Sequence, residues 1–134
     1  MTSDKQDNKH TQDQPIDVSV VTEYLPMQSE PDNDRYVFAY HITITNHGSI
    51  DAKLLSRNWI IVDADQKRQE VNGLGVVGEQ PLIASGDSYK YSSGVVLNTP
   101  VGTMHGSYEF VNPSGGHFEA PIQPFLLAMP NKVN

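Results

Sequence analysis

The sequence predicts an all-β fold in which two antiparallel sheets pack face to face. Short runs rich in Val, Ile, Thr, Tyr and Phe follow one another between clusters of Gly, Pro, Asn and Asp. No segment of ten or more residues shows a helical period free of Gly and Pro, so the helices that connect parallel strands are missing. The 134 residues correspond to one domain with one core.

Residues 35–45 form the clearest predicted strand. Tyr36, Phe38 and Tyr40 alternate with more polar residues, so one face of this strand should point into a core. A second long strand, 54–62, carries the only tryptophan of the chain, Trp59, which we expect to be a packed core residue. Further strands are expected near 16–24, 68–72, 88–97, 104–111 and 118–127, with loops at 46–49, 63–67, 100–102 and 112–116. About seven short strands predict two antiparallel sheets packed face to face.

The two ends of the chain are predicted to lie outside this domain. Residues 1–14 are polar and contain no aliphatic or aromatic anchor beyond Met1, so they are expected to form a disordered tail. The sandwich is expected to span 15–130, and residues 131–134 to form a short C-terminal tail.

Composition excludes several classes of function. The absence of cysteine excludes disulfides, thiolate metal sites and cysteine nucleophiles. The net charge is −7, and half of the sixteen acidic residues lie in the first 34 residues, so no basic stripe is available for nucleic acid or an anionic membrane. No segment has the apolar length of a signal peptide or a membrane span. These observations predict a soluble cytoplasmic protein.

The segment from Asn72 to Pro81 has the spelling G-x-G-x-x-G, formed by Gly73, Gly75 and Gly78. In a dinucleotide-binding unit the third glycine opens a helix whose N-terminus holds the pyrophosphate. Here Pro81 follows Gly78 after two residues, and no apolar residues follow at helical spacing. The glycines therefore indicate an irregular strand or bulge between the two sheets more strongly than a cofactor site.

Several motifs together closely resemble the bacterial ApaG family over about residues 16–130. They are Tyr36-Val37-Phe38-Ala39-Tyr40 with Ile42-Thr43-Ile44-Thr45-Asn46, Ser56-Arg57-Asn58-Trp59, Glu70 to Pro81 with its three glycines, Tyr91-Ser92-Ser93-Gly94, and Gly102-Thr103-Met104-His105-Gly106-Ser107-Tyr108. The resemblance implies a fibronectin-type-III-like or immunoglobulin-like sandwich.

The resemblance also implies a functional context. Bacterial genes of this family commonly lie beside one for a diadenosine-tetraphosphate hydrolase, and some members are linked to cobalt tolerance and magnesium efflux. In eukaryotes the domain is fused to an F-box protein as an interaction module. The family has no established catalytic residues, so none is carried over.

The residues themselves predict no enzyme, cofactor or helical metal motif. The sequence contains neither G-x-S-x-G nor H-E-x-x-H, and the H-x-E spelling at His117 lacks the two cysteines of a zinc deaminase. The five histidines are never four residues apart on a predicted helix. The leading hypothesis is therefore a non-enzymatic module that binds another protein, with any role in cobalt tolerance or magnesium efflux being indirect.

The protein-binding hypothesis predicts one candidate binding surface. An alternative hypothesis, that the protein binds a small ligand, predicts two further candidate sites. The apolar residues of the glycine segment, Leu74, Val76 and Val77, are candidates for a partner-facing patch or for the core. Phosphate or nucleotide could bind Gly73, Gly75 and Gly78, with charge from Lys67, Arg68 and Arg57. A divalent cation could bind the carboxylates of Glu30, Asp32 and Asp34 in an acidic turn. Exposed edge strands would also permit a homo-oligomer.

Overall fold

The computed structural model describes residues 15–131, which form eight β-strands and two short 3-10 turns. The strands are β1 (Ile16–Tyr24), β2 (Tyr36–Asn46), β3 (Ala52–Asp63), β4 (Arg68–Leu74), β5 (Leu82–Ile83), β6 (Ser88–Leu97), β7 (Val101–Val111) and β8 (His117–Ala128); the turns are η1 (Pro26–Gln28) and η2 (Pro31–Asn33). The tails expected at 1–14 and 132–134 lie outside the described residues. Within 15–131 no helix has the length and apolarity that a membrane crossing requires.

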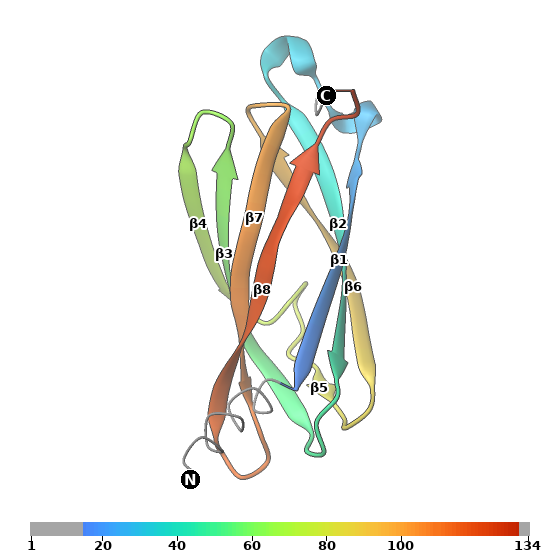
Figure 1. The fold of residues 1–134 in the computed structure, drawn as a ribbon, viewed down its shortest axis with the longest axis vertical. Helices are drawn as coiled ribbons and strands as arrows, with labels where there is room; N and C mark the ends of the chain where they lie inside the picture. Colours follow the sequence, from blue (N-terminus) through green and yellow to red (C-terminus); the bar gives the residue numbers. More distant parts are fainter. Residues whose placement is uncertain (1–14, 132–134) are drawn as a thin grey trace, which may run out of the picture.

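The strands form two antiparallel sheets that pack as the two layers of a sandwich (Figure 1). The smaller sheet has the order β1-β2-β6, and the larger has the order β4-β3-β7-β8, with β5 also pairing with β3. Strands β1 and β8 contact each other along one side of the sandwich. The other side ends in the edge strands β4 and β6, and the predicted all-β sandwich is confirmed.

The core lies between the two sheets and follows the alternation read from the sequence. Phe38 and Tyr40 of β2 are buried, as the predicted face requires. Trp59 is 2% exposed and packs edge-to-face against Tyr40 from the opposite sheet, with ring centroids 5.4 Å apart. Its expected role in core packing is therefore confirmed.

Two details of the strand prediction differ from the structure. Strand β5 was not expected, because two residues are too few for an alternating pattern and Pro81 precedes them. The predicted loop at 100–102 is shorter, because β7 already begins at Val101. Gly102 lacks a Cβ that would come within 2.7 Å of the carbonyl oxygen of Val62, so this glycine permits close strand packing and does not mark a loop.

The glycine segment interrupts the outer edge of β3. Strand β4 pairs with β3 from Val62 to Ser56, and β5 pairs with the same strand at Lys53 and Ala52. Between them, residues 75–81 leave the edge and return to it. Both ends are held at Leu55. Its carbonyl oxygen accepts hydrogen bonds from the backbone amide of Gly75 at 2.7 Å and from the side-chain Nε2 of Gln80 at 2.9 Å. We call residues 75–81 the edge excursion.

The tip of the edge excursion is a two-residue turn. The amides of Val76 and Glu79 each donate to the other residue's carbonyl, at 2.8 and 3.0 Å. The two central residues, Val77 and Gly78, have φ values of 47° and 79°, which is the pattern of a type I′ turn. Gly75 also has a positive φ, 61°, and a Cβ there would collide with the carbonyl of Glu79. The segment continues into β5 and not into a helix, as its proline predicts.

Candidate binding groove between β4 and β6

Three neighbouring cavities lie along the side of the sandwich where β4 and β6 form the sheet edges. We call them together the β4–β6 groove. Their volumes are about 280, 350 and 240 Å³, from the edge excursion toward the start of β4. The first lies between Val76–Gly78 and Tyr91–Ser93, the second between Gln69 and Val71 and Ser93–Val96, and the third between Lys67–Gln69 and Val96–Asn98. Because β4 has seven residues, the groove is about 20 Å long.

Arg57 lies where the first two cavities meet, and both cavities include it in their walls. Its Nη1 donates to the carbonyl oxygens of Leu74 and Gly75, at 3.1 and 2.9 Å. The guanidinium lies against Gly73, where an added Cβ would come within 2.7 Å of three guanidinium atoms. Gly73 is therefore the residue that leaves room for Arg57, and the structure brings these two predicted site residues together.

Trp59 forms part of the wall of the middle cavity. Its indole nitrogen Nε1 is buried and has no hydrogen-bond partner among the described residues. A buried N–H without a partner is costly, and most such groups in folded proteins are satisfied by protein, water or ligand. Trp59 is therefore a residue of this cavity wall with an unpaired donor, beside the Arg57 cation.

Tyr91 and Tyr108 connect the two sheets beside the groove. Their hydroxyl groups form a hydrogen bond of 2.5 Å between β6 and β7. Burial raises the pKa of both phenols well above the usual range, so both stay protonated at neutral pH. Tyr91 and Tyr40 also line the first cavity, and we infer that they give this part of the groove an aromatic wall.

The groove collects positive charge in a protein that is otherwise acidic. Arg57, Lys67 and Arg68 line it, which is three of the six basic residues between 15 and 131. Of the thirteen acidic residues in the same range only Asp63 lines it, and the Asp63 carboxylate accepts the amides of Asp65 and Lys67. The local charge balance is thus opposite to that of the whole chain.

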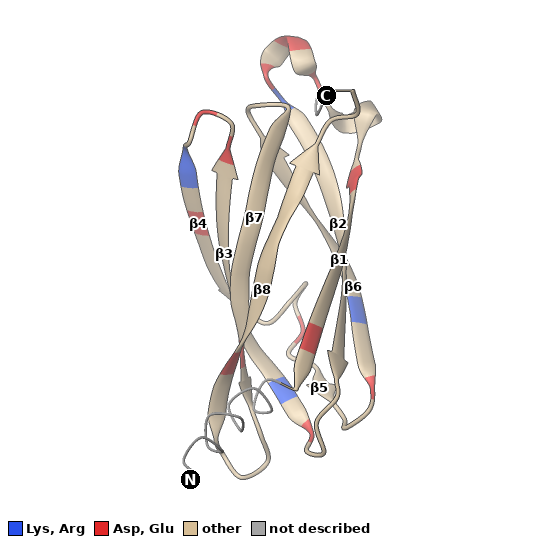
Figure 2. Ribbon diagram, in the orientation of Figure 1, with Lys and Arg blue, Asp and Glu red and all other residues tan. Residues whose placement is uncertain are grey.

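Lys67 and Arg68 do not lie beside the glycines. Arg68 pairs with Val62 at one end of β4, whereas Leu74 pairs with Ser56 at the other end. Figure 2 shows positive charge at the start of β4, at the opposite end of the strand from the edge excursion. This corrects the expectation that both cations add charge next to Gly73, Gly75 and Gly78.

The three apolar residues of the glycine segment divide between core and surface. Val76 is fully buried and belongs to the core, which corrects its assignment to a partner-facing patch. Leu74 and Val77 are 77% and 62% exposed and line the first cavity of the groove. Val77 also has a left-handed backbone, which is unfavourable for a β-branched residue.

Phosphate binding by the glycine segment would require free backbone amides in its turn. In the range 75–79 the amides of Gly75, Val76 and Glu79 already donate to carbonyl groups within the described chain. The Nη1 of Arg57 also faces two carbonyls of this segment. A pyrophosphate cradle needs several free amides that converge on one point. Phosphate binding at Gly73–Gly78 stays a prediction, and this geometry favours other uses of the segment.

The acidic turn lies at η2, between β1 and β2. Glu30 accepts a hydrogen bond from the side chain of Asn33 at 2.9 Å, and Asp34 caps the turn with a left-handed backbone. Within residues 15–131 no group of three or more His, Asp or Glu side chains is placed to hold a metal ion. Glu30, Asp32 and Asp34 are thus adjacent in sequence without forming a shared site in this structure.

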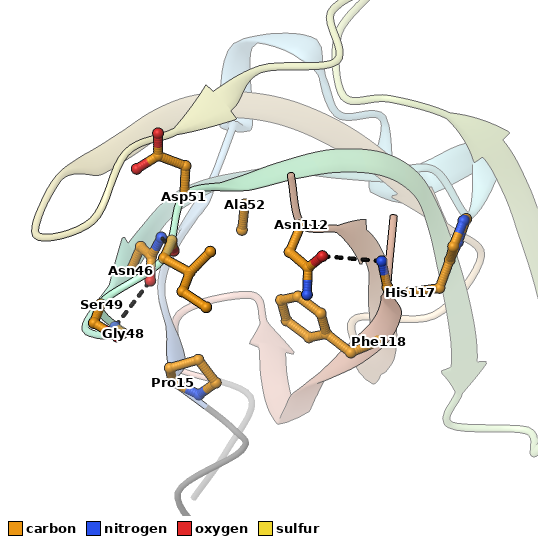
Figure 3. Close-up of a pocket in the computed structure, with 11 residues that line it drawn as sticks. Pro15, Asn46, Gly48, Ser49, Asp51, Ala52, Asn112, His117 and Phe118 are labelled. Carbon is orange, nitrogen blue, oxygen red and sulfur yellow. Dashed lines mark hydrogen bonds between the residues drawn. The ribbon is translucent and has the colours of Figure 1, made fainter. Parts of the chain in front are cut away.

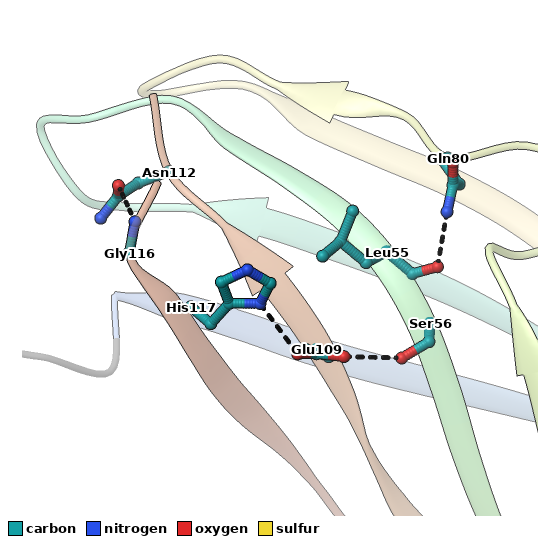
Figure 4. A network of polar contacts seen from close by, with 7 residues as sticks. All are labelled: Leu55, Ser56, Gln80, Glu109, Asn112, Gly116 and His117. Carbon is teal, nitrogen blue, oxygen red and sulfur yellow. Dashed lines mark hydrogen bonds and ion pairs between the residues drawn. The ribbon is translucent and has the colours of Figure 1, made fainter. Parts of the chain in front are cut away.

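A serine, a glutamate and a histidine form a polar network on the large sheet (Figure 4). Ser56 Oγ donates to Glu109 Oε1 at 3.2 Å, and His117 Nδ1 lies 2.9 Å from Glu109 Oε2. These hydrogen bonds, that of His117 first, hold the pKa of Glu109 below its usual value. A hydrolase triad places histidine between the nucleophile and the carboxylate. Here the carboxylate lies between the other two, so the histidine is placed against the carboxylate and not against the serine hydroxyl.

A further cavity, of about 430 Å³, lies at the end of the sandwich near Pro15 and Phe118 (Figure 3). Two asparagine side chains in its wall already have partners within the fold. The side-chain Nδ2 of Asn46 donates to the backbone carbonyls of Ile50 and Ile83, and its Oδ1 accepts from the backbone amide of Gly48. Asn112 accepts from the amides of Ser114 and Gly116. This cavity therefore offers fewer free recognition groups than the β4–β6 groove.

Sequence reasoning missed part of the groove. Trp59 was assigned to the core, and no sequence signal shows that its N–H lacks a partner. Tyr40 and Tyr91 carried only a signal for strand alternation. The placement of Arg57 opposite Gly73 depends on the register of β3 and β4, which the sequence does not specify.

Comparison with known proteins places the chain in a family. The ApaG domain model matches residues 26–112. Protein ApaG of Thiobacillus denitrificans is 59% identical over 119 residues, covering 89% of this chain and 94% of the relative. Protein ApaG of Aromatoleum aromaticum is 56% identical with the same coverage. A crystal structure from Bordetella pertussis has 53% identity and a TM-score of 0.84, covering 87% of this chain and 94% of that one. The chain belongs to the ApaG family.

Proposed function

We propose that this ApaG protein is a non-enzymatic module that binds an extended segment of another protein in the β4–β6 groove. The observation that carries the proposal is the reversed charge balance of the groove, with three of six described cations and one of thirteen described acids in its walls. The partner segment is accordingly acidic and partly apolar. Complementary charge of this kind speeds encounter and selects partners.

The shape of the groove suits an extended chain. Its length of about 20 Å corresponds to roughly six extended residues. Edge strands on both sides leave backbone groups available, which is the arrangement used when a peptide adds to a sheet. Leu74 and Val77, both exposed, provide apolar contacts at one end. The strained backbone of Val77 is a further indication, because strain of this kind clusters at binding sites.

The wider role follows from this binding. We place any contribution to cobalt tolerance or magnesium efflux downstream of the bound partner, since the described residues provide no metal cluster of their own. The proposal also places the protein in the cytoplasm. It assigns no catalytic residue, in keeping with the carboxylate-centred arrangement of Ser56, Glu109 and His117.

An affinity comparison with matched variants tests the proposal. The full chain is immobilised as wild type, as the double variant Leu74→Ser, Val77→Asn, and as the control Val21→Thr. Val21 is 66% exposed on β1, at the far edge of the small sheet. Proteins retained from lysate are identified and then titrated as purified proteins against all three.

The expected result is one partner that binds wild type and the Val21→Thr control equally and binds the double variant at least tenfold more weakly. Its binding should weaken with added salt, because the groove is cationic. A partner that binds all three forms with the same affinity would place the interface elsewhere. A lysate in which no protein distinguishes the groove variant from wild type would reject the proposal.

A further inference from the structure

Two groups in the middle of the β4–β6 groove lack a partner that their chemistry calls for. The Trp59 N–H is buried without a partner among residues 15–131. Arg57 uses Nη1 for two carbonyl oxygens, and no carboxylate of the described chain lies within ion-pair distance of its guanidinium. A partly buried cation without a counter-charge and a buried N–H are both left to a partner from outside the fold.

The cavity around these donors has both polar and apolar residues in its wall. Beside Arg57 and Trp59, the middle cavity of about 350 Å³ is lined by the apolar residues Ile61, Val71, Val95 and Met104 and by the polar residues Gln69 and Ser93. A cavity of this volume that combines apolar residues with a few polar groups has the size of a small-ligand site. The cation determines which end of a ligand is charged, and the apolar residues favour an apolar group in the rest of it.

We propose that this cavity binds a carboxylate that carries an apolar body, with Arg57 pairing the carboxylate, the Trp59 N–H donating to the same group, and Ile61, Val71, Val95 and Met104 holding the body. The inference deepens the proposed function, because it states the chemistry that the groove recognises. It rests on the proposed function in one respect: if the groove binds another protein, the carboxylate belongs to a segment of that protein.

A carboxylate fits these donors better than a phosphate. The guanidinium matches the two oxygens of a carboxylate, and a single cation balances its single charge. A phosphate dianion would need further charges, but Lys67 and Arg68 line only the third cavity.

The single tryptophan gives a direct experiment, because the indole N–H of the chain has one NMR signal. The ¹⁵N-labelled full chain is titrated with 3-phenylpropanoate and, separately, with its neutral isostere 3-phenylpropanamide. The expected result is a saturable shift of the Trp59 indole signal with the acid and a weaker shift with the amide. Sodium pyrophosphate, at matched ionic strength, should leave the signal in place.

Variants test the role of Arg57. Arg57→Gln should weaken binding of the acid by about tenfold or more, the size expected for a charged hydrogen bond. Arg57→Lys keeps the charge without the planar fork and should bind with intermediate affinity. Lys90→Gln removes a cation from β6 outside the groove walls and should bind as wild type does. The backbone amide spectrum of each variant shows whether it is folded.

Three results would overturn the inference. They are an indole signal that does not move up to millimolar acid, equal binding of the acid and the amide, and equal binding by wild type and Arg57→Gln. A silent indole would show that the acid does not reach the Trp59 N–H. If the small acid fails while the groove variant still loses its protein partner, the proposed function stands without this site.

The source of the carboxylate is decided by a second pair of probes. N-acetyl-glycyl-phenylalanine has a free chain end, and N-acetyl-glycyl-phenylalanine amide does not. Tighter binding of the peptide acid than of 3-phenylpropanoate would support a protein chain end as the occupant. Equal or weaker binding of the peptide acid would support a free small acid, and both results keep the carboxylate site.

Discussion

Arg57 and Gly73 depend on each other across the β3–β4 pair. The glycine has no Cβ, and the guanidinium occupies the space where a Cβ would lie. From that position Nη1 reaches the carbonyls of Leu74 and Gly75 and holds the base of the edge excursion. One residue of the glycine motif therefore makes room for a side chain, while Gly75 and Gly78 provide left-handed backbone.

Val77 is expected to be a site where stability increases on substitution. Asn-Gly is the preferred pair at the centre of a type I′ turn, whereas a left-handed valine costs about 1 kcal/mol or more. Because Val77 is mostly exposed, Val77→Asn loses little packing and should raise Tm by roughly 4 °C. Val77→Thr keeps the β-branch and should give no gain. Calorimetry measures both, and a lower Tm for Val77→Asn would contradict the strain argument.

His117 is expected to set the pKa of Glu109. In wild type the histidine contributes the largest part of the lowering, and Ser56 contributes the next. His117→Ala should raise the pKa of Glu109 toward its ordinary value, and Ser56→Ala should raise it less. Carboxyl ¹³C titration measures these changes. An unchanged Glu109 midpoint in His117→Ala would show that the contact is not maintained in solution.

The lowered pKa of Glu109 also determines how its contact with His117 should change the stability of the fold with pH. A carboxyl whose folded pKa is lowered stabilises the fold above the pKa of the unfolded chain. That contribution is lost as pH falls through the lower folded value. Removing His117 should therefore reduce the dependence of stability on pH in the acidic range, while the neutral fold is retained.

At the scale of elements, the edge excursion divides the outer edge of β3, so that two strands, β4 and β5, pair along it in place of one. Strands β4 and β5 continue each other along β3, and the bulge of β3 at Leu54 and Ser56 lies at the break between them. The amide of Leu54 donates to the carbonyl of Pro81, so both sides of the break are held. Val76, within the excursion, is buried in the core and lines this end of the groove.

Gly73→Ala is expected to displace Arg57 without unfolding the protein. The added Cβ meets the end of a flexible side chain and not backbone, so the guanidinium can move away. Loss of its two carbonyl contacts should cost about 1–3 kcal/mol in urea denaturation. Gly94→Ala on β6 is the matched control, because a Cβ there lies an ordinary 3.5 Å from the carbonyl of Phe38. Equal stability of wild type and Gly73→Ala would contradict the proposed role of Gly73.

The elements that the sequence predicted well are those whose burial alternates. Residues 35–45 alternate over a whole strand, and β2 is observed at nearly the same bounds. Strand β5 was missed because Leu82 and Ile83 give no period, and its pairing depends on the turn at Val77 and Gly78 that brings the chain back to β3. The prediction that no helix follows Gly78 was correct because Pro81 excludes one locally.

At the scale of the whole molecule, the groove combines residues that are distant in the sequence. Tyr40, Arg57, Val71 and Ser93 lie on β2, β3, β4 and β6, so they meet only when both sheets have formed in the right register. Residue types therefore predicted Arg57 as a candidate but could not place it opposite Gly73. Lys67 and Arg68 were assigned to the glycines by closeness in sequence, and strand length separates them by most of β4.

The two sheets are joined in the core by the hydrogen bond between Tyr91 and Tyr108, and alkaline pH should separate them. Burial raises both pKa values above the ordinary 10.0, so the unfolded chain loses these protons first. The contribution of these two phenols to stability should be constant below about pH 10 and then fall by up to about 1.4 kcal/mol per pH unit for each phenol. Phenolate absorbance should show two of the six tyrosines ionising only as the fold is lost. Tyr91→Phe should leave one such late tyrosine, and ionisation of all six near pH 10 in a folded protein would contradict the buried pair.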